Sequence, residues 1–399
     1  ILFFIYTIFM KGLASTLLFV FAIVSTVSAN CSGDIKVTSQ GNLDAIQTCK
    51  KYQGTIEIEG VGTNKLSLRG IQSLSGDIIV KNNNALQTLT LENLEILDGQ
   101  LKLENNKILS KFEPKALVGV RSFEAAVQPA LSSIGFPAGL AQADRFVVSD
   151  TTTTRIDGLK MDKVSNMIID NNIYLKSVGL NNLTEISGSL TVSANSPGLN
   201  LDVSSLKNVK EASFRNLAGI NLDGLKHVGG DISFISNKFS ELSLKEVSEI
   251  DGTLTITNNN ELTKLGLPKL HRLAGALSLG HNSQLNTIEA FPELEEVDGT
   301  LDIVGTFDEV KFPKLSDVRG GLNVQTSSSK FSCNDMSKLK NGVIKGNSFL
   351  CKASVAKPKS GLTSKGGVDG DDLEGSAGST QLAWFLVSFM SLAGTLLLL

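Results

Sequence analysis

The chain has 399 residues, of which 37 are basic and 40 are acidic, so its formal net charge is −3. This balance leaves no basic footprint for nucleic acid, and one Trp and three Tyr are too few for a base-stacking platform. Nucleic acid is therefore excluded as a partner. The length would fit two or three globular domains, but an internal repeat favours one elongated body.

Residues 1–29 have the features of a secretory signal peptide. Met10 and Lys11 supply a start and a positive charge, Leu13–Val24 is apolar, and Val27–Ala29 forms a small-residue cleavage site. We expect translation to begin at Met10. The alternative is a membrane anchor over Ile1–Val24, which the lysine inside it disfavours. A signal peptide implies an oxidising compartment for the mature chain.

A glycine-headed unit recurs about every 22 residues between residues 33 and 320. In its clearest copy, Gly252 is followed by Leu254 and Ile256, which is the alternation of a strand with one buried face. Glycine suits a corner where one coil packs closely on the next. A fixed period of this size predicts an all-β solenoid of about 14 rungs, either a parallel β-helix or a leucine-rich-repeat-like coil. The anchors are Gly33, Gly54, Gly76, Gly99, Arg121, Asp144, Ser165, Gly188, Lys210, Gly230, Gly252, Gly275, Gly299 and Gly320.

A second apolar stretch follows each of these strands. Its apolar residues are spaced by two or three positions, and it contains Pro268, Pro292 and Pro313, which disfavour helices. We therefore expect short strands and turns there. Stacked about 4.8 Å apart, the rungs would extend for roughly 60 Å.

Asparagine recurs seven residues after the anchor in seven of the 14 copies. A buried amide at a turn can bond the backbone of the adjacent coil, and identical amides can stack into a ladder. We interpret these residues as structural and not as ligand-binding. They are Asn83, Asn106, Asn172, Asn195, Asn237, Asn259 and Asn282.

Four cysteines flank the repeats, and the two at each end are 18 residues apart: Cys31 and Cys49, Cys333 and Cys351. We expect local pairing, because the end rungs of a solenoid expose apolar surface and strand edges that need caps. A disulfide that closes such a loop stabilises by about 3 kcal/mol. Zinc binding is the alternative, but the chain has no CxxC motif and no partnering histidine.

Two glycosylation sequons occur. Asn182 (Asn-Leu-Thr) falls in a repeat turn and is the better acceptor. Asn30 (Asn-Cys-Ser) adjoins a predicted disulfide and is the poorer one.

The C-terminal region has the arrangement of a signal for a glycosylphosphatidylinositol (GPI) anchor. A flexible linker over 353–375 leads to small residues and then to an apolar run, Leu382–Leu399. We expect removal of 376–399 and attachment at Gly375 or Ser376, with Gly370 as a further candidate. The alternative is a membrane-spanning helix, for which an 18-residue run is marginal.

Parallel β-helices also host polysaccharide-degrading enzymes, so carboxylates on adjacent rungs were considered as catalysts. Aspartate recurs beside the anchors at Asp77, Asp98, Asp231, Asp251 and Asp298. Because these residues follow the repeat, we interpret them as turn caps, and Asp231 with Asp251 is the pair for an enzymatic alternative. The histidines, His227, His271 and His281, are scattered. No motif calls for a catalytic residue, a metal or a cofactor.

Three phrases carry a family resemblance: DGTLTITNNN (251–260), LPKLHRLAGALSL (267–279) and FPELEEVDGTLDI (291–303). With the terminal signals and cysteine pairs, they resemble the fungal GPI-anchored cell-wall organisation proteins of the Sps2/ECM type, whose repeats are similar to the receptor L domain. The resemblance covers residues 30–399.

The resemblance implies a right-handed β-helix of L-domain type, with lobes at 30–120 and 121–352 and a boundary in the degenerate stretch 107–155. It further implies an N-glycosylated, non-enzymatic protein of the plasma membrane and cell wall, with a role in wall organisation, integrity and morphogenesis. Expected partners are wall polysaccharide such as glucan, wall proteins, and the membrane through a GPI lipid. A surface enzyme acting on wall polysaccharide and a receptor-like ligand-binding module are the alternatives.

Overall fold

The computed structural model describes residues 30–361. The predicted signal peptide and the candidate anchor residues Gly370, Gly375 and Ser376 lie outside the described residues. Within 30–361, no helix is long and apolar enough to cross a bilayer.

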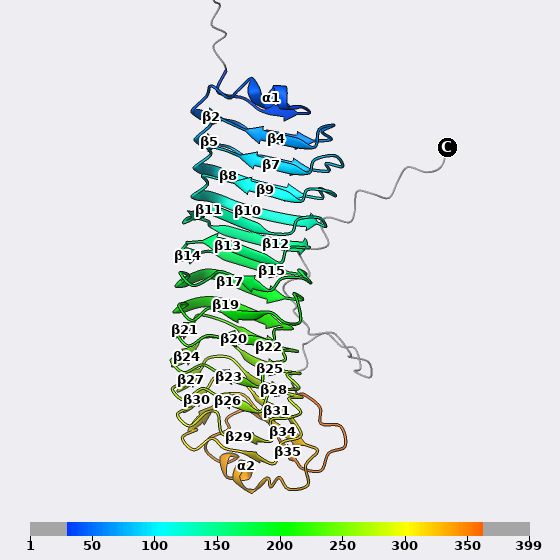
Figure 1. Cartoon of the computed structure of the whole chain (residues 1–399). Coiled ribbons are helices and arrows are strands. Elements are labelled where there is room, and N and C mark those ends of the chain that lie inside the picture. Colours follow the sequence, from blue (N-terminus) through cyan, green and yellow to red (C-terminus); the bar gives the residue numbers. More distant parts are fainter. Residues whose placement is uncertain (1–29, 362–399) are drawn as a thin grey trace, which may run out of the picture.

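The described chain coils into a parallel β-solenoid (Figure 1), which confirms the predicted fold class. One strand per coil joins a single long sheet, the main sheet, and each strand pairs in parallel with the next. Its strands, joined by about 13 turns, are β1 (Ile35–Val37), β3 (Ile56–Glu59), β6 (Ile78–Lys81), β8 (Ile96–Glu104), β10 (Gly119–Gln128), β12 (Arg145–Thr151), β15 (Asn166–Asp170), β17 (Glu185–Ser193), β19 (Asn208–Arg215), β22 (Ile232–Ile235), β25 (Leu254–Thr257), β28 (Leu277–Gly280), β31 (Leu301–Gly305) and β34 (Leu322–Thr326).

One further rung, β35 (Phe349–Lys352), extends the main sheet beyond the predicted anchors. It pairs with β34, and a Cβ on Gly346 would lie 2.4 Å from the carbonyl carbon of Gly320, so Gly346 is a further anchor. The intervening chain forms helix α2 (Asn334–Leu339), which lengthens this coil and hides the period.

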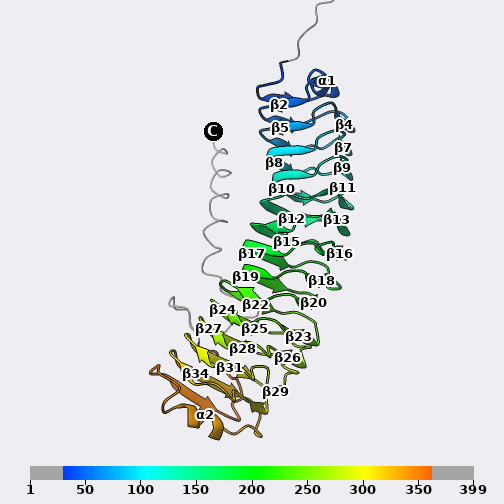
Figure 2. The same cartoon turned by 90° about the vertical axis from the view of Figure 1, so that its left-hand side faces the viewer.

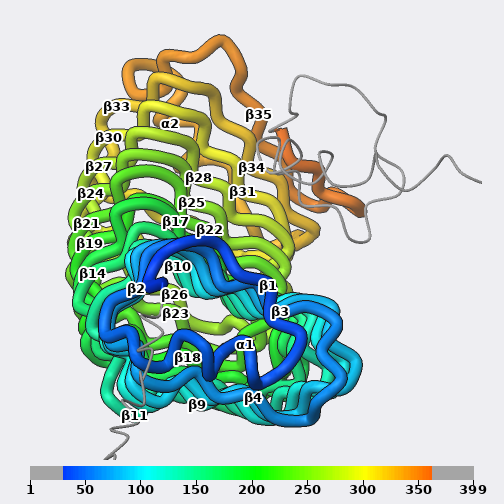
Figure 3. Tube along the Cα trace, turned by 90° about the horizontal axis from the view of Figure 1, so that it is seen from above, coloured from blue at the N-terminus to red at the C-terminus, as the bar shows by residue number. Residues whose placement is uncertain are grey.

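Two further walls close each coil, as the view along the axis shows (Figure 3). Short strands before the corner are β2 (Lys51–Gln53), β5 (Ser73–Ser75), β14 (Lys163–Val164), β21 (His227–Val228), β24 (Glu249–Ile250), β27 (Arg272–Leu273), β30 (Glu296–Val297) and β33 (Asp317–Val318). The opposite wall holds β4 (Lys65–Leu68), β7 (Thr88–Leu91), β9 (Lys111–Pro114), β11 (Ile134–Leu140), β13 (Arg155–Leu159), β16 (Ser177–Val178), β18 (Asn200–Asp202), β20 (Gly219–Asn221), β23 (Glu241–Ser243), β26 (Lys264–Gly266), β29 (Thr287–Ile288) and β32 (Glu309–Val310).

A continuous apolar core fills the coil from Val37 to Ile344. Inward side chains such as Leu254 and Ile256 are fully buried, as period-two alternation requires. Figure 2 shows that the stack bends along its length. The main sheet continues across the expected lobe boundary, since β8 pairs with β10 there. A division into lobes at 30–120 and 121–352 stays a prediction.

Backbone contact explains the glycine at the corner. A Cβ on Gly275 would lie 2.4 Å from the carbonyl carbon of Gly252, a distance that no side chain can adopt. Where Arg121 replaces glycine, the β8–β10 ladder shifts register between Val120 and Ser122, and the arginine is exposed.

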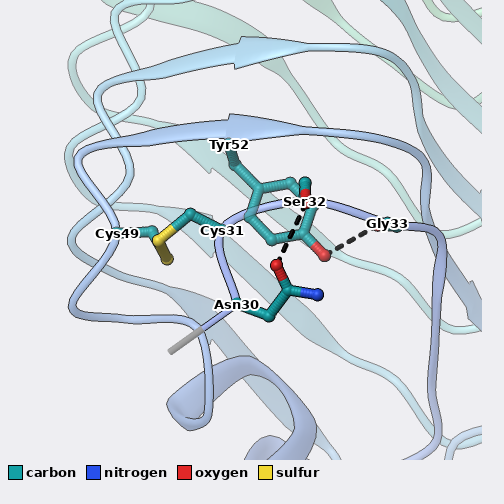
Figure 4. Close-up of a disulfide and its surroundings, with 6 residues drawn as sticks. All are labelled: Asn30, Cys31, Ser32, Gly33, Cys49 and Tyr52. Carbon is teal, nitrogen blue, oxygen red and sulfur yellow. Dashed lines mark hydrogen bonds between the residues drawn. A yellow bond between two sulfur atoms is a disulfide. The ribbon is translucent and has the colours of Figure 1, made fainter. Parts of the chain in front are cut away.

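Disulfides close both ends, as expected from the cysteine spacing. Cys31 bonds to Cys49 and Cys333 to Cys351, with Cα–Cα distances of 5.6 and 5.9 Å. At the N-terminal end, the Tyr52 hydroxyl also donates to the Gly33 carbonyl at 2.8 Å (Figure 4). The helix α1 (Gln40–Asp44) covers the first coil, and its Leu43 side chain is buried there, as a cap of the first rung requires.

Candidate functional site

The seven repeat asparagines form hydrogen-bonded ladders inside the solenoid and are at most 6% exposed. The Asn259 Oδ1 accepts from the backbone N–H of Asn237 at 2.9 Å and from its Nδ2 at 3.0 Å. The Asn259 Nδ2 donates to the Phe234 carbonyl at 2.9 Å and to the Asn282 Oδ1 at 3.1 Å. The amide is fully engaged, so these positions hold turns together and offer nothing to a ligand.

The residue immediately before each ladder position adopts a left-handed backbone. Its φ lies between 50° and 59° in ten coils, although none of the ten residues is glycine. His281 is one of them, so this histidine is a turn residue. The set is Asn82, Asn105, Val127, Asp150, Asn171, Ala194, Asn216, Ser236, Asn258 and His281.

The repeat aspartates that follow an anchor cap the next coil. The Asp231 Oδ1 accepts the backbone N–H of Thr253 at 2.7 Å, and the Asp77 Oδ1 accepts that of Gln100 at 2.7 Å. Hydrogen bonds of this kind to a carboxylate are strong and fix the corner. They account for the recurrence of aspartate without catalysis.

The aspartates that precede an anchor form ion pairs. Asp98 pairs with Arg121, and Asp298 pairs with both Arg272, at 2.9 Å, and Arg319, at 2.8 Å. These pairs join neighbouring coils at the corner. They explain a second set of recurrent carboxylates on structural grounds.

Asp231 and Asp251, the candidate catalytic pair, are both engaged in corner contacts. Both are exposed, Asp231 is committed to the backbone, and Asp251 faces the His227 Nε2 at 3.5 Å. His271 similarly faces Glu249 at 3.3 Å. Residues 30–361 contain no cluster of three or more His, Cys, Asp or Glu side chains able to hold a metal.

The outer face of the main sheet carries a regular row of partly exposed residues. Strands β17, β19, β22, β25 and β28 each present one hydroxyl residue between two buried positions, and register places these residues side by side. We call this row the hydroxyl lane: Thr191, Ser213, Ser233, Thr255 and Ser278. The Ser233 Oγ donates to the Ser213 Oγ at 3.0 Å. Neighbouring strands place one hydroxyl about every 4.8 Å.

The same row changes character on the N-terminal side of the lane. Ile168 and Val147 continue the register as uncharged residues. Beyond them, Glu124 faces Lys102 at 3.6 Å, which begins a stretch of ion pairs toward β1. The uncharged part of this row is therefore limited to the middle of the solenoid, where Glu211 and Arg215 flank Ser213 on the same face of β19.

On the C-terminal side, the chain itself covers the row. Asp302 follows Ser278 in register and is only 1% exposed, because the Gly361 N–H donates to its Oδ1 at 2.9 Å and the Ser360 hydroxyl donates to its Oδ2. The next residue, Asn323, donates to the Lys359 carbonyl at 3.0 Å. Figure 3 shows this last segment against the outer side of β31 and β34. It ends the lane after Ser278.

The hydroxyl lane was not among the residues singled out from the sequence. Its signal is nevertheless visible there, because Ser or Thr lies three residues after five successive anchors from Gly188 to Gly275. A comparison of the outward positions between copies of the repeat is therefore enough to detect the lane in the sequence.

The two sequon asparagines are both exposed. Asn182 lies in a turn, and the Thr184 hydroxyl of its sequon donates to the Asp162 carbonyl at 3.0 Å. The Asn30 Oδ1 accepts from the Ser32 hydroxyl at 3.0 Å, beside the Cys31–Cys49 disulfide (Figure 4). Glycosylation at either position stays a prediction.

Fold and surface together define a disulfide-capped β-solenoid with a polar display face and, within residues 30–361, no assembled metal centre. The chain belongs to the fungal cell-wall protein family that includes the cell wall protein ecm33 of Schizosaccharomyces pombe, to which it is 34% identical over 352 residues, 87% of this chain and 82% of that protein. This confirms the resemblance seen in the repeats.

Two other relatives extend the comparison. A cell surface GPI-anchored protein of Arthroderma benhamiae is 30% identical over 350 residues, 88% of this chain and 89% of the relative. The sporulation-specific protein 2 of Saccharomyces cerevisiae is 30% identical over 350 residues, 86% of this chain and 69% of the relative. No family model and no solved structure matches the chain.

Proposed function

We propose that the protein is a non-enzymatic, GPI-anchored glycoprotein of the fungal cell surface that contributes to cell-wall organisation, integrity and morphogenesis. Support comes from relatives named as a cell wall protein and as cell surface GPI-anchored proteins. The expected anchor at Gly375, Ser376 or Gly370 would tether the solenoid to the membrane, and glycosylation at Asn182 would add a surface glycan.

The proposed molecular action is binding of neutral wall polysaccharide, such as β-glucan, along the hydroxyl lane. The observation that carries it is the in-register row from Thr191 to Ser278 on five adjacent strands. Each hydroxyl can donate and accept a hydrogen bond, which matches the hydroxyl groups of sugars. A row of equivalent groups suits a polymer of equivalent units, and the absence of charge within the row suits a neutral one.

Co-sedimentation of the secreted protein with particulate wall β-glucan and with chitin tests this action. A triple variant, Ser213→Ala, Ser233→Ala and Thr255→Val, removes three lane hydroxyls while keeping the shape of the surface. At about 0.5–1.5 kcal/mol per hydrogen bond, we expect at least a tenfold weaker association with glucan.

Thr263→Val with Thr287→Val is the matched control, because both residues are exposed and lie outside the main sheet. It should bind like the wild type. Equal binding by the lane variant, or no binding by the wild type, would exclude the lane as the polysaccharide site.

Absence of catalysis is part of the proposal, since Asp231 and Asp251 are exposed and engaged in corner contacts. Incubation with glucan and chitin should release no soluble sugar. Hydrolysis that disappears in Asp231→Asn or Asp251→Asn would show instead that the protein is a wall enzyme.

A further inference from the structure

A polar cavity of about 500 Å³ opens on the wall opposite the main sheet, near the N-terminal end. Its floor is the outer face of β4, β7 and β9, which lie below α1 in Figure 1. The hydroxyl lane belongs to a different wall and to later coils, so this cavity is a separate feature of the molecule.

Strand register arranges the floor as a grid of three rows across three strands. Thr88 pairs with both Lys65 and Lys111, so these three form the first row, and two residues further along the strands Thr90 lies between Ser67 and Glu113. One more step along the strands gives Arg69, Glu92 and Lys115. Side chains lie about 4.8 Å apart between strands and about 7 Å apart along them.

Basic side chains occupy all four corners of this grid: Lys65, Arg69, Lys111 and Lys115. Two of them are neutralised, since the Lys111 Nζ contacts Glu113 at 2.7 Å and the Lys115 Nζ contacts Glu92 at 2.9 Å. Lys65 and Arg69 have no ion pair with any residue in 30–361. The cavity lining therefore carries a net charge of +2, from four basic and two acidic groups, in a chain whose own net charge is −3.

Hydroxyl groups occupy the middle of the grid. Thr90 is only 7% exposed, and its Oγ1 donates to the Glu113 carboxylate at 3.2 Å. The Ser67 Oγ is buried and has no hydrogen-bond partner in the described residues. Gln40 of α1 lies over Ser67, with its amide bonded to both the N–H and the carbonyl of that residue at 2.9 Å.

We infer that this cavity binds a sugar phosphate, either free or as a phosphorylated unit of a glycan. Guanidinium and ammonium groups are the side chains that recognise phosphate, and Arg69 and Lys65 are available for it. The Glu113 carboxylate, which is partly exposed, would accept hydrogen bonds from the sugar hydroxyls. The inference does not rest on polysaccharide binding by the lane.

Isothermal titration of the secreted protein with mannose 6-phosphate, with mannose and with inorganic phosphate tests the inference. We expect mannose 6-phosphate to bind at least about tenfold more tightly than either fragment, because only the ester engages both the cations and the Glu113 carboxylate. The double variant Lys65→Gln/Arg69→Gln should weaken its binding by tenfold or more. Thr90→Val, which removes the hydroxyl that orients Glu113, should reduce the preference for the ester over inorganic phosphate.

Lys238→Gln/Lys264→Gln is the charge-matched control, because it removes two exposed lysines elsewhere on the solenoid. It should bind mannose 6-phosphate like the wild type, and thermal melting should show that both double variants are folded. Equal binding of mannose and mannose 6-phosphate, an unaffected Lys65→Gln/Arg69→Gln variant, or no binding at all would overturn the inference. Inorganic phosphate binding as tightly as the ester would overturn the assignment of a sugar.

Discussion

Asn237 donates a hydrogen bond from its Nδ2 to the Oδ1 of Asn259 at 3.0 Å, and both side chains are almost completely buried. The two amides come from neighbouring coils 22 residues apart. The same contact recurs between Asn259 and Asn282, so a polar ladder runs beside the apolar core and sets the alignment of each coil on the next.

Removing one amide from this ladder should be costly. Asn259→Ala removes the acceptor of the Asn237 N–H and the side-chain donor to the Phe234 carbonyl. The Asn237 Nδ2 and the Asn282 Oδ1 each lose one of two hydrogen bonds, so we expect a loss of about 3 kcal/mol in unfolding free energy. Asn260→Ala, the exposed next residue, should change it by less than about 0.5 kcal/mol. Guanidinium denaturation measures both, and similar values would refute the structural role of the ladder.

A glycine at the corner and a glycine on the opposite wall should differ sharply in their tolerance of a side chain. Gly275→Ala places a Cβ 2.4 Å from the backbone of the previous coil, so we expect a destabilisation of about 2–3 kcal/mol. Gly266→Ala is the control, since its nearest neighbour would be 3.9 Å away. Melting temperatures of the two variants should separate clearly, and a stable Gly275→Ala protein would show that the stacked coils can move apart.

The N-terminal disulfide should stabilise the first coil. The double substitution Cys31→Ser/Cys49→Ser removes the bond between two cysteines that are 18 residues apart in the sequence. We expect the free energy of unfolding to fall by about 3 kcal/mol. Hydrogen exchange should increase first in β1 and β3 and not in β28, because each coil contacts only its neighbours. Uniform loosening along the whole solenoid would contradict this local role.

The partly buried carboxyl of Asp170 should make the stability of the fold depend on pH. Burial raises the pKa of its carboxyl above the ordinary value, with the nearby Asp150 charge adding to the effect, and its Oδ1 has no partner in residues 30–361. The ionised form therefore opposes folding above the folded-state pKa, and this penalty disappears as the pH falls below the unfolded-state pKa. Asp170→Asn should raise the melting temperature at pH 7 but not at pH 3.

Exposed Asp162 provides the matched substitution, Asp162→Asn, which should leave the melting temperature unchanged at both values of pH. A gain in Asp170→Asn that persists at pH 3 would mean that the carboxyl charge is not its cause.

The solenoid could be predicted because every coil obeys the same local rules. Gly252 needs no side chain at the corner, and Leu254 and Ile256 alternate into the core, so one copy defines the others. Strand β35 could not be predicted in this way. Helix α2 lengthens its coil, so Gly346 does not follow Gly320 at the spacing of the other anchors.

The hydroxyl lane and the cavity were harder to predict than the core. The lane residue Ser233 is meaningful only through its register with Ser213 and Thr255, which depends on how the coils stack. The cavity depends further on Gln40, whose contact with Ser67 spans 27 residues and follows from the position of α1 rather than from the repeat. Such contacts join residues far apart in the sequence, so they cannot be predicted from a local sequence pattern.

The central claim is that a neutral polysaccharide lies across the hydroxyl lane, with successive sugar units on successive strands. The most direct measurement is the dissociation constant of the secreted protein for β-glucan oligosaccharides of increasing length. The account predicts that affinity rises with each added sugar and levels off once the chain spans the row from Thr191 to Ser278, and that the lane variant loses this length dependence. Binding that is already maximal for a disaccharide, or absent at every length, would contradict it.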